Sequence, residues 1–151
     1  MIRTKILKCL LSLSALLLIN GVFAQGILLL DNWKISNFGS TISTKTSSCI
    51  ILRQYSPIYY EGICMVAAPV IVTCKWTTPL NYVDMGVTLI FTYQNRDTET
   101  IEKNIPKGVS TEQKLVYIPQ KASGKKIMKL EIQHGQTAME VKIFSVEIAG
   151  Y

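Results

Sequence analysis

Apolar and polar residues alternate along most of the chain after residue 25, and the apolar runs are short. A period of two is typical of half-buried β-strands, whereas the 3.6-residue repeat of an amphipathic helix is not found. The runs are rich in Ile, Val, Tyr and Thr, which strands favour, and turn-forming residues separate them. Strands are therefore predicted at residues 26–30, 33–38, 48–54, 58–66, 69–76, 86–93, 99–104, 113–118, 126–133 and 139–148.

The rhythm of short strands and turns also predicts the fold class. Parallel strands joined by helices would need long amphipathic crossovers, and the sequence contains none. Evenly spaced short strands with turn signals between them are typical of antiparallel β-sandwiches. We therefore expect an all-β, antiparallel β-sandwich that forms a single domain over residues 25–151.

Alternation assigns inner and outer faces within the longer predicted strands. The strand at 126–133 is expected to bury Met128, Leu130 and Ile132. The strand at 86–93 is expected to bury Val87, Leu89, Phe91 and Tyr93.

The last predicted strand changes phase in its middle. Up to Ile143 the odd-numbered positions are apolar, and from Phe144 onwards the even-numbered ones are. Since a strand cannot change its buried face without an extra residue, this switch predicts a β-bulge or a bend between sheets at Ile143-Phe144.

The first 24 residues follow another pattern, that of an export signal. Three basic residues precede a ten-residue apolar run, Leu10–Ile19, and the segment ends in Val22-Phe23-Ala24. A basic region, an apolar region and a small-x-small ending together define a cleavable signal, and the run is shorter than the ~20 residues that span a membrane. The sequence thus predicts a signal peptide over residues 1–24 and a secreted or periplasmic mature chain without a transmembrane segment. No N-x-S/T sequon occurs, which favours a bacterial source.

Export changes the charge balance. The full chain has 16 basic and 10 acidic residues, a net charge of +6. The signal peptide removes three basic residues and no acidic one, so the mature chain has 13 minus 10, or +3. A charge this small gives little support to a nucleic-acid partner.

Cys49, Cys64 and Cys74 remain in the mature chain. An oxidising compartment favours one disulfide among them. Cys64 and Cys74 lie in neighbouring apolar segments that a hairpin would bring together, so this pair is preferred, with Cys49–Cys64 second. The spacings do not match a zinc site.

The sequence offers few groups for catalysis. Its one histidine, His134, lies in a predicted turn and is expected to be solvated. No G-x-S-x-G motif or glycine-rich phosphate loop is present. Two carboxylates could still cleave a glycosidic bond, although the acidic residues are scattered. An enzyme is therefore the least favoured class.

Aromatic residues suggest a different chemistry. A flat aromatic ring packs against the apolar C–H face of a sugar, and nearby amides or carboxylates bind its hydroxyls. Trp76 and Tyr82 bracket a polar loop and form a candidate rim, although the parity of Trp76 also fits a core position. Tyr59 and Glu61 are the other candidates, because adjacent Tyr59 and Tyr60 must face opposite sides of their strand. The predicted ligand-binding set is therefore Trp76, Tyr82, Tyr59 and Glu61.

Several segments resemble a known family. Residues 126–133 carry an L-x-I pattern and residues 139–148 end in V-x-I, as do the last two strands of jelly-roll carbohydrate-binding modules. Leu30–Trp33 and Glu112–Ile118 are similar to other strands of these modules. The resemblance implies a jelly-roll-like sandwich and sugar binding. It also implies a structural calcium near the chain ends, with Asp31 and Glu147 as ligands.

Three functions follow from these observations. The first is a secreted, non-catalytic carbohydrate-binding, lectin-like module whose partner is a glycan or a cell-surface polysaccharide. The second is an exported protein-interaction or structural module, such as a small effector, an adhesin or an envelope component, that binds an envelope or host protein. The third is a glycan-active enzyme with two carboxylates.

Overall fold

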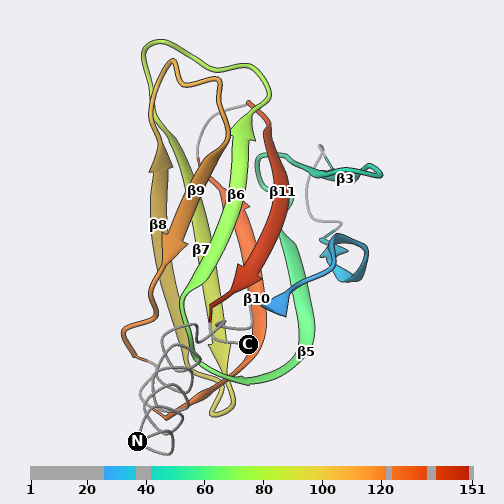
Figure 1. Cartoon of the computed structure of the whole chain (residues 1–151), viewed down its shortest axis with the longest axis vertical. Helices are drawn as coiled ribbons and strands as arrows, with labels where there is room; N and C mark the ends of the chain where they lie inside the picture. Colours follow the sequence, from blue (N-terminus) through green and yellow to red (C-terminus); the bar gives the residue numbers. More distant parts are fainter. Residues whose placement is uncertain (1–25, 37–41, 122–123, 136–138, 150–151) are drawn as a thin grey trace, which may run out of the picture.

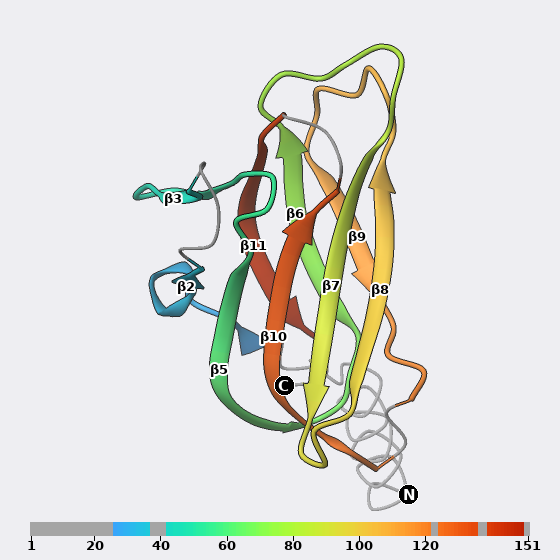
Figure 2. The same cartoon turned by 180° about the vertical axis from the view of Figure 1, so that it is seen from behind.

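The computed structural model describes residues 26–36, 42–121, 124–135 and 139–149. Two antiparallel sheets pack face to face into a β-sandwich (Figures 1 and 2). The predicted fold class is confirmed. The strands are β1 (Gly26–Ile27), β2 (Lys34–Ile35), β3 (Thr44–Lys45), β4 (Ile50–Leu52), β5 (Ile58–Val66), β6 (Val70–Trp76), β7 (Met85–Tyr93), β8 (Thr98–Ile105), β9 (Gln113–Tyr117), β10 (Lys126–His134) and β11 (Val141–Ile148).

The two sheets differ in strand order. The six-stranded sheet has the order β3-β4-β11-β6-β9, and β1 also pairs with β11. The five-stranded sheet has the order β2-β5-β10-β7-β8. The first and last strands are therefore neighbours, with Ile27 opposite Glu147.

Sequence and structure differ most in the first third of the chain. A short 3₁₀ helix, η1 (Leu30–Asn32), begins at the last residue of the predicted strand 26–30, and only the two-residue strands β1 and β2 form within the predicted strands 26–30 and 33–38. Residues 37 and 38 lie outside the described part. The short strand β3 was not predicted, because its two residues are polar and exposed.

The core lies between the sheets. The four residues expected to be buried on β7, Val87, Leu89, Phe91 and Tyr93, are all within it. The phase switch on β11 is confirmed, because the pairing with β6 shifts register between Ile143 and Ser145.

The prediction for Met128 is wrong. The pairing of β10 with β7 shifts register between Ile127 and Lys129, so Met128 is the extra residue of a bulge. The pairing with β5 shifts at the same place, with the extra residues on β5. Ile127 is buried in its place, and Met128 is 36% exposed. Leu130 and Ile132 are buried as expected.

The predicted Cys64–Cys74 disulfide is also wrong. β5 and β6 do not form a hairpin, since the chain crosses from one sheet to the other between them. Cys64 is exposed, whereas Cys74 and Cys49 are buried, and all three are free thiols. Burial raises the pKa of Cys74 to about 12.

The predicted signal peptide, residues 1–24, lies outside the described residues. Within the described part, no helix has the length and apolar character needed to cross a bilayer.

Candidate functional site

Trp76 does not form part of a surface site. It lies on the inner face of β6 and is 1% exposed, so its ring offers no face to a ligand. Trp76 follows the alternation of its strand, in which the side chains of Val70, Val72 and Cys74 also point into the core. The prediction of Trp76 as a rim platform is therefore corrected to a core position.

Tyr59 and Glu61 lie on the outer face of the five-stranded sheet, next to charged side chains from two neighbouring strands. Lys34 Nζ donates to Glu61 Oε2 at 2.8 Å, and Lys129 Nζ donates to Glu131 Oε2 at 3.0 Å. The ammonium group of Lys129 also lies 4.7 Å from the Tyr59 ring centroid, and that of Lys34 lies 5.9 Å away. Cation–π contacts therefore occupy the Tyr59 ring, and a sugar would have to displace an ammonium group to stack there.

The ion pair of Lys34 and Glu61 keeps both groups charged at neutral pH. The hydrogen bond from Lys34 lowers the pKa of Glu61, and the same contact raises the pKa of Lys34. Because both side chains are exposed, water screens the pair, and it orients these side chains more than it stabilises the fold.

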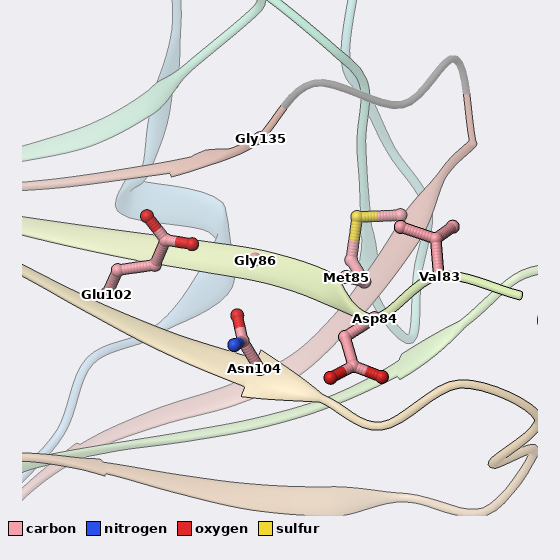
Figure 3. Close-up of a pocket in the computed structure, with 7 residues that line it drawn as sticks. All are labelled: Val83, Asp84, Met85, Gly86, Glu102, Asn104 and Gly135. Carbon is pink, nitrogen blue, oxygen red and sulfur yellow. The ribbon is translucent and has the colours of Figure 1, made fainter.

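A pocket of about 440 Å³ opens where β7 begins, at the edge of the outer face of the five-stranded sheet. Figure 3 shows the side chains around it. Its lining residues are Val83, Asp84, Met85, Gly86, Glu102, Asn104 and Gly135.

The floor of the pocket depends on Gly86. A Cβ atom placed there would collide with Oε1 of Glu102 and lie 3.5 Å from Oδ1 of Asn104. The two side chains come from β8, where Asn104 is directly opposite Gly86 in the register. The missing side chain thus lets two acceptor oxygens converge above the strand, as Figure 3 shows. Such a pair can bind the hydroxyl donors of a sugar.

Tyr82 lies immediately before the pocket residues Val83 and Asp84 and is 78% exposed. Two backbone N–H groups of the segment after β8 hold its loop in place. Lys107 N donates to Asp84 Oδ1 at 2.8 Å, and Gly108 N donates to Leu80 O at 2.7 Å. Tyr82 is therefore adjacent in sequence to the pocket lining without being a lining residue itself, and Tyr59 and Glu61 lie on β5, two strands away from β7 in the same sheet.

His134 is buried, so the prediction of a solvated turn residue is wrong. It ends β10 on the inner face, opposite Val87. Desolvation lowers its pKa, and neither ring nitrogen has a hydrogen-bond partner among the described residues.

The two predicted calcium ligands, Asp31 and Glu147, both take part in hydrogen bonds within the described residues. Glu147 Oε1 accepts a 3.0 Å hydrogen bond from Ser145 Oγ, and the backbone oxygen of Asp31 accepts one from Lys45 Nζ at 2.9 Å. No group of three or more His, Cys, Asp or Glu residues in the described part could hold a metal ion. The calcium pair stays a prediction.

Sequence reasoning missed Gly86, Glu102 and Asn104. A signal was present, because Glu102 and Asn104 have the outward parity of their strand, and Gly86 begins a strand that is otherwise rich in β-branched and aromatic residues. A glycine in such a strand often marks a close approach by another group. What the sequence could not give was the pairing of β7 with β8 that joins the three.

Comparisons with known proteins bear on the fold. No protein-family model matches the chain. No curated protein sequence matches it either.

Solved structures share the architecture. CBM29_1, a family 29 carbohydrate-binding module from Piromyces equi, is similar with a TM-score of 0.53 and 12% identity, covering 83% of this chain and 86% of that chain. Xylanase10C from Cellvibrio japonicus, solved in complex with xylopentaose, is similar with a TM-score of 0.57 and 12% identity over 83% of this chain. The chain spans only 29% of the length of that xylanase structure. The predicted resemblance is confirmed at the level of fold: the chain is a β-sandwich like those of carbohydrate-binding modules.

Proposed function

We propose that the protein is an exported, non-catalytic module that binds a glycan on the outer face of its five-stranded sheet. The observation that carries this proposal is the pocket above Gly86, where the side chains of Glu102 and Asn104 approach the same point, next to the loop that carries the exposed Tyr82. The likeness to a carbohydrate-binding module supports it through the fold alone.

Each part of the site has a role in sugar binding. The Tyr82 ring stacks on the apolar face of one sugar residue. The oxygens of Glu102 and Asn104 accept hydrogen bonds from its hydroxyls, and charge makes the bond to Glu102 the stronger one. A hydroxyl-rich ligand suits this arrangement, because the pocket supplies acceptors close together.

The site extends along the sheet. From β8, which carries Glu102, to β5, which carries Tyr59 and Glu61, there are three strand spacings, or ~14 Å. This length accommodates a short oligosaccharide lying across the strands. Tyr59 would contact the far end only after Lys129 moves away from its ring.

The absence of catalysis is part of the proposal. Asp84 and Glu102 are the carboxylates of the pocket, and in Figure 3 they point in different directions. Asp84 is engaged by the backbone N–H of Lys107. A hydrolase needs two carboxyl groups aimed at one bond from either side, and this pair lacks that arrangement.

A glycan-array screen of the purified protein tests the proposal. We expect binding that Tyr82→Ala reduces by about tenfold, as the loss of a stacked ring implies. Tyr55→Ala is the matched control, because Tyr55 is also highly exposed, at 69%, but precedes β5 on the far side of the sheet from β8. The control should bind like the wild type.

Three results would contradict the proposal. Binding to no glycan by folded protein would favour the interaction-module alternative, whose partner would be an envelope or host protein. Equal loss in the two tyrosine variants would place the site elsewhere. Release of shorter sugars from a bound glycan would show an enzyme.

A further inference from the structure

The outer face of the six-stranded sheet carries lysines on three adjacent strands. Lys75 on β6 lies directly opposite Lys142 on β11. Lys114 on β9 lies opposite Thr73, one side-chain row farther along β6. Like charges directly opposite each other destabilise a sheet, so the fold alone gives no reason for the Lys75–Lys142 pair.

The bulge on β11 adds an aromatic ring to this face. The register shift between Ile143 and Ser145 turns Phe144 outward, and the Lys75 ammonium lies 5.6 Å from its ring centroid. This cation–π contact holds Lys75 above the sheet next to Lys142 without neutralising its charge.

These three lysines have no carboxylate partner within the described residues. Within the described residues, Lys75, Lys142 and Lys114 form no ion pair, although Glu112 immediately precedes β9. Glu147, the acidic residue on the outer face of β11, is held by the Ser145 hydroxyl instead.

The two outer faces of the sandwich therefore differ in charge. On the five-stranded sheet, Lys34 and Lys129 are each bonded to a carboxylate, whereas Lys103 and Lys126 form no ion pair in the described part of the chain. Lys103 lies opposite Val87 and Lys126 opposite Val66, so neither of them has a second lysine directly across the strands. On the six-stranded sheet the lysines have no such partners in the part of the chain that the structure describes. A ligand with closely spaced negative groups is therefore more complementary to the second face, where two lysines without carboxylate partners lie side by side, than to the first.

We propose that the outer face of the six-stranded sheet is a second binding surface, for an acidic polysaccharide. Lys75 and Lys142 bind one carboxylate or sulfate group, and Lys114 binds the next acidic group along the polymer. The three lysines lie on β11, β6 and β9, across two strand spacings of ~10 Å in all, which a linear polymer with repeated charges can follow. This surface is independent of the pocket above Gly86, because it is on the opposite side of the sandwich.

The test measures binding of the purified protein to polygalacturonate and to heparin by titration calorimetry at low salt. The variant carries Lys75→Gln and Lys142→Gln. The control carries Lys103→Gln and Lys126→Gln, exposed lysines of the five-stranded sheet with the same change in charge. We expect the variant to lose about tenfold or more in affinity, and the control less than about twofold. Wild-type binding should weaken as salt rises, since the contacts are exposed.

The stability of the variant separates a binding role from a structural one. Removing a like-charge pair should leave the unfolding temperature unchanged or raise it, so lost binding would not reflect lost folding. Equal loss in the variant and the control would show a general effect of net charge and would overturn the proposal. So would the absence of binding to both polymers, or binding to phosphatidylglycerol vesicles in their place. Because Tyr82→Ala does not touch this face, its loss of neutral-glycan binding with acidic-polymer binding intact would distinguish the two proposed sites.

Discussion

The hydroxyl of Tyr93 donates a 2.6 Å hydrogen bond to Oε2 of Glu99, within the hairpin of β7 and β8. Glu99 is only 7% exposed and also accepts from Gln120 N at 2.7 Å and Lys121 N at 2.9 Å. One carboxylate thus fastens the segment after β9 to the hairpin that carries Gly86 and Glu102. The scaffold of the proposed site depends on this buried charge.

Glu99→Gln should therefore destabilise the protein by ~1–3 kcal/mol, because an amide cannot accept three hydrogen bonds as a carboxylate does. Urea unfolding at neutral pH measures the change. Glu112→Gln, at an exposed position, is the matched control and should have almost no effect. A Glu99→Gln variant as stable as the wild type would show that the three hydrogen bonds to the Glu99 carboxylate do not stabilise the fold.

Stability should fall in acid through the same group. Burial alone would raise the pKa of Glu99, but the hydrogen bonds from Tyr93, Gln120 and Lys121 outweigh it, and the pKa is lowered from 4.5. A carboxyl whose pKa is lower in the folded state stabilises the fold above its unfolded pKa, and this contribution disappears as the pH falls through the folded pKa. Denaturation midpoints between pH 6 and pH 2 should drop less steeply in Glu99→Gln than in the wild type.

The burial of His134 should make the stability of the fold depend on pH in a second, higher pH range. Desolvation lowers its pKa below 6.5, so the unfolded chain takes up a proton that the folded chain does not. The stability of the wild type should decline as the pH drops below about 6.5. In His134→Leu this decline should be absent between pH 7 and pH 5, and an unchanged decline would assign the effect to another group.

The three described cysteines should differ in reactivity. Cys64 is exposed and should react with a thiol reagent in the native protein, whereas Cys49 and Cys74 are buried and should react only on unfolding. The raised pKa of Cys74, about 12, further suppresses its thiolate. Mass spectrometry of the labelled peptides identifies each site. A Cys64–Cys74 crosslink in non-reduced protein would contradict the separation of β5 and β6 into two sheets.

Gly86→Ala should weaken glycan binding with little loss of stability. The added methyl group collides with the Glu102 carboxylate and moves it away from Asn104. Since alanine is tolerated in a strand, the unfolding temperature should change by only a few degrees. Thr98→Ala, on the same face of the sheet, is the control. Wild-type affinity in Gly86→Ala would show that the position of Glu102 does not matter for binding.

Local pattern predicted most of the long strands, because alternation and turn residues act over a few positions. It also predicted the β11 bulge, since a phase change within one strand is visible in the sequence. The Met128 bulge left no such mark, because Ile127 and Met128 are adjacent and both apolar. Its position depends on the register with β5 and β7, which is a long-range property.

The candidate site was predictable only in part. The exposure of Tyr82 was predictable because its loop is polar and follows a strand, whereas its part in ligand binding stays a prediction. Trp76 was misplaced because a residue at a strand end can face either the rim or the core, and packing of the two sheets decides between them. Gly86, Glu102 and Asn104 form one feature only through the pairing of β7 with β8.

The most direct test of glycan binding on the five-stranded sheet is a nuclear magnetic resonance titration with the best oligosaccharide from the array. We predict that the backbone amide signals of Tyr82, Gly86, Glu102 and Asn104 shift together and saturate at one dissociation constant. Those of Lys75 and Lys142, on the other sheet, should stay in place. Saturable shifts confined to the six-stranded sheet, or no shifts in the five-stranded sheet, would contradict it.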